Sequence, residues 1–117
     1  MAQRCDDRKG GAVVQILVND QTFRLWSMNA AFIAQANELK ASGKQATAMF
    51  GKLIDGSDCD TQWTFHLDAN DMSWPDVATE VCDGRPSDIE GNKPSWLNDV
   101  KRWCPWNTKV IVVEERP

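Results

Sequence analysis

The only histidine of the chain, His66, is the first candidate for catalysis. It lies with Asp68 on the polar face of the alternating segment 62–68, and Glu80 is expected on a neighbouring strand. A histidine beside a carboxylate is a common general base, which would suit a hydrolase that uses His66 and Glu80. The alternative is a polar cross-strand pair on a solvated sheet face. Because no Ser, Thr or Cys stands in a nucleophile motif, we expect no catalytic residue and no enzymatic activity.

Three carboxylates, Asp55, Asp58 and Asp60, fall within six residues and raise the question of calcium. The spacing of an EF-hand loop, with its later bidentate glutamate, is absent. A single histidine also disfavours a zinc site. We therefore expect no metal and no cofactor, and this acidic turn is the place where calcium would bind if the protein took it.

An exposed loop suggests a different kind of site, one that binds a protein. Segment 71–75 is predicted to be a loop in which the unbranched Met72 precedes the small Ser73 and Trp74, and Pro75 stiffens the exit. A rigid loop loses little conformational entropy on binding, and Met72 would fit an apolar specificity pocket of a serine protease.

Two basic residues are further probes of a protease pocket. Lys44, in the turn after a predicted helix, suits a trypsin-like pocket. Arg85 is less suitable because Pro86 hinders the placement of the bond between them. The alternative for each of these segments is an ordinary surface loop.

The six tryptophans, in a chain without tyrosine, are the next candidates for binding. Three fall at predicted core positions, and three lie near loops or helix ends, where an indole could stack on a sugar ring or anchor a protein interface. A carbohydrate-binding module is therefore the alternative to an inhibitor, although filling the core is the expected use of four of the six. The core positions are Trp26, Trp63 and Trp103, and the others are Trp74, Trp96 and Trp106.

Composition restricts the class of protein and of partner. The chain of 117 residues has the length of one domain, and its 42% hydrophobic content is that of a globular protein. A net charge of -4 disfavours nucleic acid and anionic membranes as partners. No apolar run approaches the roughly 18 residues that a membrane span needs.

The four cysteines indicate an oxidising compartment. Cys5, Cys59, Cys82 and Cys104 are dispersed and contain no C-x-x-C pair, which suits two long-range disulfides better than a metal site. We expect a secreted or periplasmic protein in which Met1 is an added start after removal of a signal peptide. The alternative is a cytosolic protein with four free thiols. Residues 1–11 are an N-terminal extension that Cys5 ties down.

Hydrophobic periodicity predicts an α+β fold with a mainly antiparallel sheet of about six strands and two helices packed on one face. The firmest element is a helix over residues 28–40, with Ser27 as N-cap and Gly43 as its left-handed end. The predicted strands are residues 12–18, 22–26, 46–55, 62–68, 76–82 and 109–113, the last of them central. Helical turns are predicted over residues 88–90 and 95–103, and a loop over residues 69–75.

Three stretches carry a resemblance to a known family: residues 63–68 (W-x-F-H-L-D), 80–90 (E-V-C-D-G-x-P-S-D-I-E) and 102–106 (R-W-C-P-W). The pattern resembles a family of small secreted domains that occur alone or attached to larger extracellular proteins and have no established enzymatic activity. The likeness runs from about Phe23 to Val113. It implies the pairing Cys82–Cys104 with Cys5–Cys59, and the extension that holds Cys5 departs from the common pattern.

Taken together, the sequence predicts a secreted, non-enzymatic binding protein. The primary expectation is a serine protease inhibitor that acts through an exposed rigid loop. A carbohydrate-binding module is the alternative, and a hydrolase using His66 and Glu80 is the third interpretation.

Overall fold

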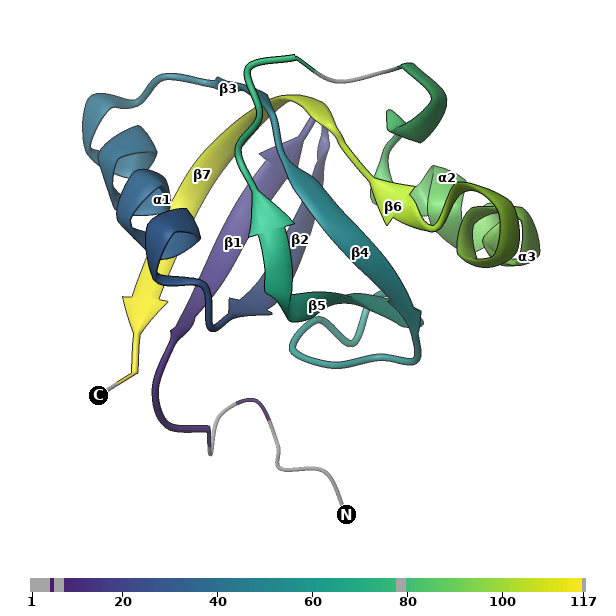
Figure 1. Ribbon diagram of the computed structural model, residues 1–117, viewed down its shortest axis with the longest axis horizontal. Coiled ribbons are helices and arrows are strands. Elements are labelled where there is room, and N and C mark those ends of the chain that lie inside the picture. The colour runs from purple at the N-terminus through teal and green to yellow at the C-terminus, as the bar shows by residue number, and fades with distance from the viewer. Residues whose placement is uncertain (1–4, 6–7, 78–79, 117) are drawn as a thin grey trace.

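The computed structural model describes residues 5, 8–77 and 80–116 (Figure 1). Two antiparallel sheets form the molecule, a four-stranded one in the order β2-β1-β7-β3 and a three-stranded one in the order β5-β4-β6. The predicted α+β class and antiparallel pairing are confirmed, and the strands divide between two sheets. The strands are β1 Ala12–Val18, β2 Gln21–Ser27, β3 Ala46–Ala48, β4 Phe50–Asp55, β5 Phe65–Ser73, β6 Arg102–Trp103 and β7 Trp106–Glu115.

The last strand is central, as predicted. β7 lies between β1 and β3, and the C-terminal part of β7 pairs with β1. The register shifts between Gln15 and Ile16 of β1, opposite Ile111, which has no partner in the register. In this irregular region Ile111 and Val112 stay exposed, while Val110 is buried.

Helix α1, Ala30–Ser42, packs chiefly on β7 at one side of the molecule (Figure 1). Its end at Gly43 is confirmed, with φ of 71° at that residue. The predicted N-cap Ser27 is wrong: Asn29 caps the helix and accepts a hydrogen bond from Phe32 N. Because the helix starts after Met28, that side chain leaves the apolar stripe and is 46% exposed.

The segment predicted as one strand, 46–55, forms two strands in the structure, β3 and β4. β3 pairs with β7, whereas β4 joins the other sheet. The break is at Met49, whose side chain is fully buried and whose N–H donates to the Pro105 carbonyl. The chain thus crosses from one sheet to the other at a buried residue.

The predicted loop 69–75 is also mostly strand. Phe65 and Leu67 are buried, as the alternation predicts, but β5 continues to Ser73 and pairs with the start of β4. Residues 69–73 lack alternation, so their extended structure comes from pairing with β4 rather than from a local pattern.

The predicted strand 76–82 is wrong within the described residues. Residues 76 and 77 form no regular structure, and Glu80–Cys82 is a single 3-10 turn, η2. Helix α2, Pro86–Gly91, confirms the helical turn after Pro86. The helix predicted over 95–103 starts and ends earlier than expected. It consists of α3, Lys93–Ser95, followed by a π-turn, Trp96–Val100. The helical stretch ends at Lys101, whose φ is 67°. These turns lie on the side of the molecule opposite α1 (Figure 1).

The core between the two sheets is built on three aromatic rings. Phe23 of β2 stacks on Phe65 of β5 with ring centroids 5.3 Å apart. Trp103 of β6 meets both rings edge-on, at 5.1 Å and 6.1 Å. All three side chains are essentially inaccessible to solvent, so each sheet contributes to the same aromatic contact.

The outer edge of β2 is covered by side chains of the turn that follows β4. Asp60 accepts a hydrogen bond from Arg24 N, and the Trp63 indole donates to the Thr22 carbonyl. Asp60 is only 5% exposed and also accepts bonds from Gln62. These side chains occupy two backbone positions that an added strand would need.

Both disulfides that the resemblance implies are present. Cys5 is bonded to Cys59 and Cys82 to Cys104, with Cα–Cα distances of 5.1 Å in each pair. They span 54 and 22 residues, which in the chain-entropy model restricts the unfolded chain by about 4 and about 3 kcal/mol. No helix of the described residues is long and apolar enough to span a membrane.

Candidate functional site

The structure places the predicted inhibitory segment at the end of a strand instead of in a loop. Met72 pairs with Gly51 in the β4–β5 ladder and is 3% exposed. Ser73 is exposed, but Trp74 is 8% exposed. The expectation that Met72 projects into a protease pocket is therefore wrong, because that side chain belongs to the main core.

Trp74 is an anchor for the chain that leaves β5. Its indole stacks on Phe32 of α1, with ring centroids 4.7 Å apart and an interplanar angle of 7°. The indole N–H donates to the Phe32 carbonyl at 3.0 Å. A stack and a hydrogen bond to the same helical residue fix this tryptophan in position and direction.

A second anchor follows eight residues later in the chain. Cys82 is 7% exposed and is bonded to the fully buried Cys104, whose N–H donates to the Cys82 carbonyl at 2.8 Å. The neighbouring Trp103 indole donates to the Gly84 carbonyl at 2.8 Å. The disulfide and these two hydrogen bonds hold the chain against β6.

The connection between the two anchors presents apolar side chains to solvent. We call residues 75–81 the valine loop; residues 78 and 79 within it, and the side chain of residue 80, lie outside the described structure. Val77 is 85% exposed and Val81 is 74% exposed, more than any other large hydrophobic residue of the described chain. An apolar side chain held out from a chain that is fixed at both ends is the arrangement of a binding loop.

The sequence pattern misses this loop by a few residues. Pro75 and the turn-forming residues before it favour segment 71–75 as the loop, whereas the pattern assigns Val77 and Val81 to a strand. Valine favours strands, but neither of these two residues pairs with a strand in the described structure.

Lys44, the trypsin-like probe, is exposed as expected. It follows the left-handed Gly43, and its N–H donates to the Ser42 hydroxyl at 3.2 Å. Arg85 is instead the N-cap residue of α2, where its N–H and its guanidinium both contact Asp88. Lys44 therefore remains accessible on a tight turn, while Arg85 is engaged within α2.

The tryptophans considered as sugar platforms are largely covered. Trp74 is buried against Phe32, and Trp96 packs over Gly84, where a Cβ would lie 3.2 Å from the indole. Trp106 is half-buried, and its indole nitrogen is buried. Trp74 is therefore not accessible to a sugar ring, whereas Trp96 and Trp106 keep part of their surface exposed.

A polar cluster that the sequence does not reveal joins the helical turns to β4 and β5. Lys93 Nζ lies 2.7 Å from Asp55 Oδ1 and donates to the Thr64 hydroxyl at 2.9 Å. Glu90 accepts both the Thr64 N–H, at 2.6 Å, and the Thr64 hydroxyl. The hydrogen bond and charge of Lys93 lower the pKa of Asp55, and the Thr64 hydroxyl bond lowers the pKa of Glu90. Because each polar group has an oppositely charged or hydrogen-bonding partner, the cluster fastens the turns to the sheet.

The proposed catalytic pair does not form a described site. The His66 ring nitrogen Nδ1 lies 2.7 Å from the Gly56 carbonyl, near the end of β4. The Glu80 side chain lies outside the described residues. His66 is thus held by a backbone carbonyl of the adjacent turn.

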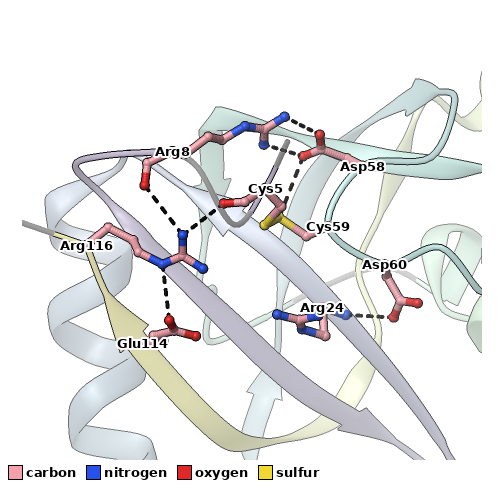
Figure 2. Close-up of a disulfide and its surroundings, with 8 residues drawn as sticks. All are labelled: Cys5, Arg8, Arg24, Asp58, Cys59, Asp60, Glu114 and Arg116. Atoms are coloured by element: carbon pink, nitrogen blue, oxygen red, sulfur yellow. Dashed lines mark hydrogen bonds and ion pairs between the residues drawn. A yellow bond between two sulfur atoms is a disulfide. The ribbon is translucent and has the colours of Figure 1, made fainter. Parts of the chain in front are cut away.

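The three aspartates of the acidic turn contact three different partners. Asp55 pairs with Lys93, and Asp58 forms an ion pair with Arg8, as Figure 2 shows. Asp60 accepts the Arg24 N–H from the edge of β2. Among the described residues, no three His, Cys, Asp or Glu side chains come together as a metal site.

Comparison with curated proteins gave no match, and neither did comparison with solved structures. A family match covers residues 11–117, which is nearly the whole chain and includes both sheets, α1 and the valine loop. The family is described as the BP-74 N-terminal domain. The chain therefore belongs to the BP-74 N-terminal domain family.

Proposed function

We propose that the protein is a secreted, non-enzymatic binding domain that inhibits a serine protease through the valine loop. The observation that carries this proposal is the exposure of Val77, 85%, on a chain anchored at Trp74 and at Cys82. This loop replaces the segment around Met72, because Met72 itself is buried.

The anchors support inhibition because they reduce the cost of binding. A flexible segment loses conformational entropy when it enters a protease cleft, and anchors at Trp74 and Cys82 lower this cost because they fix where the loop begins and ends. Val77 is short and branched, which suits the small apolar specificity pocket of an elastase-type enzyme. Val81 lies next to Cys82 and would extend the apolar contact.

The compartment follows from the same covalent features. Two disulfides in a chain of this size are typical of proteins that fold in an oxidising environment. All four cysteines form these two bridges in the described structure. Secretion would also bring the domain to extracellular proteases.

The test is an inhibition assay against four enzymes. The purified protein at micromolar concentration is added to elastase, subtilisin, chymotrypsin and trypsin, and residual hydrolysis of a chromogenic peptide is measured. We expect inhibition of elastase, and a loss of about a hundredfold in affinity for Val77→Asp, because the charge would have to enter an apolar pocket. Val77→Arg is expected to shift inhibition toward trypsin.

Matched controls separate the loop from the rest of the surface. Val112→Asp makes the same change at an exposed valine on β7 and should leave inhibition unchanged. Lys44→Ala tests the other exposed probe: if it, rather than Val77→Asp, abolishes inhibition of trypsin, the binding loop is the turn after α1. Full activity of all four proteases in the presence of the protein would reject inhibition of these enzymes.

A further inference from the structure

The two disulfides of the protein differ in their surroundings. Cys82 and Cys104 are 7% and 0% exposed, and Cys104 directly follows Trp103, a member of the main core. Cys59 is also buried, but its partner Cys5 is only half-buried. A thiolate must reach a sulfur atom to exchange with a disulfide, so Cys5 is the more open point of attack.

The Cys5–Cys59 bridge is part of a small second apolar cluster. Cys59 belongs to this cluster together with Val13 of β1 and Trp26 of β2, and Cys5 packs against it. The family match begins at residue 11, after Cys5 and Arg8. This bridge therefore joins a residue that precedes the family's domain to a turn on the domain's surface.

Two arginines hold the same region by polar contacts (Figure 2). Arg8 forms a two-pronged ion pair with Asp58, next to Cys59, and its guanidinium lies 5.7 Å from the centre of the Trp26 ring. Arg116, after the end of β7, donates to the Cys5 carbonyl at 2.9 Å. We call the Cys5–Cys59 disulfide and the Arg8–Asp58 ion pair the N-terminal latch.

An apolar surface lies beneath the latch. Val13 is 2% exposed and Trp26 is 9% exposed, although both face away from the main core. Arg8 and Cys59 contribute to this cover. Without the disulfide, no covalent bond joins Cys5 to the turn that contains Asp58 and Cys59, and only the noncovalent contacts of Arg8 and Arg116 hold this region in place.

We propose that the N-terminal latch is a redox-sensitive switch. A dithiol reductant attacks the Cys5 sulfur, Cys59 leaves as a thiolate, and the second thiol of the reductant then displaces Cys5 and forms the reductant's own disulfide. Two electrons and two protons pass to the protein, which gains the thiols of Cys5 and Cys59. Arg8 then separates from the β1–β2 face and uncovers Trp26, while the Cys82–Cys104 bridge and both sheets persist.

Stepwise reduction under native conditions tests this order. The protein is titrated with dithiothreitol, quenched with iodoacetamide at intervals, and mapped by mass spectrometry. We expect Cys5 and Cys59 to be alkylated at least tenfold faster than Cys82 and Cys104. Simultaneous reduction of both bridges, or earlier reduction of Cys82–Cys104, would overturn the proposal.

Tryptophan fluorescence tests what the latch covers. Reduction of Cys5–Cys59 should shift the emission to the red with an unchanged far-ultraviolet circular dichroism spectrum. The Trp26→Phe protein should lose this shift, since Trp26 is the indole beneath Arg8. The same red shift in Trp26→Phe, or none in the wild type, would mean that Trp26 is not uncovered.

A variant without the bridge separates a switch from a structural clamp. Cys5→Ser combined with Cys59→Ser should fold, show the red-shifted emission without reductant, and show no further shift when dithiothreitol is added at the concentration that opens the latch. An unfolded double variant would show that the bridge is required for the fold, which contradicts the proposal.

Discussion

Asn29 connects the start of α1 to the strand that leads to the valine loop. Its side-chain oxygen accepts Phe32 N at 3.0 Å, which caps the helix. Its side-chain nitrogen donates to the carbonyls of Asn70 and Met72 in β5, at 3.3 Å each. Only an amide offers an acceptor and two donors in one short side chain. We therefore predict that substitutions at Asn29 separate two contributions to stability.

The magnitudes follow from these contacts. In Asn29→Ala, loss of the cap costs about 1 kcal/mol. Loss of two long, partly exposed hydrogen bonds to β5 adds about 1 kcal/mol more. Asn29→Ser keeps a good cap but cannot reach β5, so we expect it to cost about 1 kcal/mol in total.

Urea unfolding followed by circular dichroism measures these differences. The expected order of unfolding free energies is wild type, Asn29→Ser, Asn29→Ala, with steps of about 1 kcal/mol, each of which lowers the melting temperature by about 4 °C. Asn37→Ala makes the same replacement at an exposed position of α1 and should change stability by less than about 0.5 kcal/mol.

Two results would refute this reasoning. Equal destabilisation by serine and alanine would show that the cap contributes nothing. A serine variant as stable as the wild type would show that the bridge to β5 contributes nothing, and that Trp74 is positioned without help from Asn29.

Two further predictions concern backbone strain and acid stability. Gly11 has φ of 63°, and an added Cβ would lie 2.2 Å from the Ser27 carbonyl oxygen, so Gly11→Ala should cost at least about 3 kcal/mol by urea unfolding. Gly43 has a similar φ but open space around it, and Gly43→Ala should cost only about 1 kcal/mol; equal losses would contradict the role of the clash. Because Lys93 lowers the pKa of Asp55, the stability from this pair is complete above the ordinary aspartate pKa of about 3.9 and is lost as the pH falls through the lowered value. Lys93→Gln should therefore be less stable at pH 7 and lose less stability between about pH 5 and pH 2; an unchanged acid dependence would exclude Asp55 as a contributor.

Local patterns in the sequence predict much of the fold. The alternation around Phe65 and Leu67 identifies the buried face of β5, and the left-handed end of α1 at Gly43 follows from residue type. The α+β class follows from hydrophobic periodicity, and the number and spacing of the cysteines indicate two disulfides. These features depend on neighbouring residues or on cysteine count, which a single sequence displays directly.

The remaining features depend on contacts between distant segments. Met49 divides a predicted strand because Pro105, 56 residues later, offers it a carbonyl. The strand structure of residues 69–73 comes from pairing with β4, and this pairing buries Met72, the residue expected to enter a protease. Trp74 is buried because Phe32 offers it a ring and a carbonyl. No local pattern contains these partners, so the sequence places the site a few residues away from the loop that the structure exposes.

The covered rim of β2 has a consequence for behaviour at high concentration. Asp60 and Trp63 bind the backbone of Arg24 and Thr22 from the side, and the opposite border of the same sheet is β3, only three residues long. A second molecule thus finds little free main chain on which to lengthen this sheet into a fibre. The domain is therefore suited to reach high concentrations without polymerising through its four-stranded sheet.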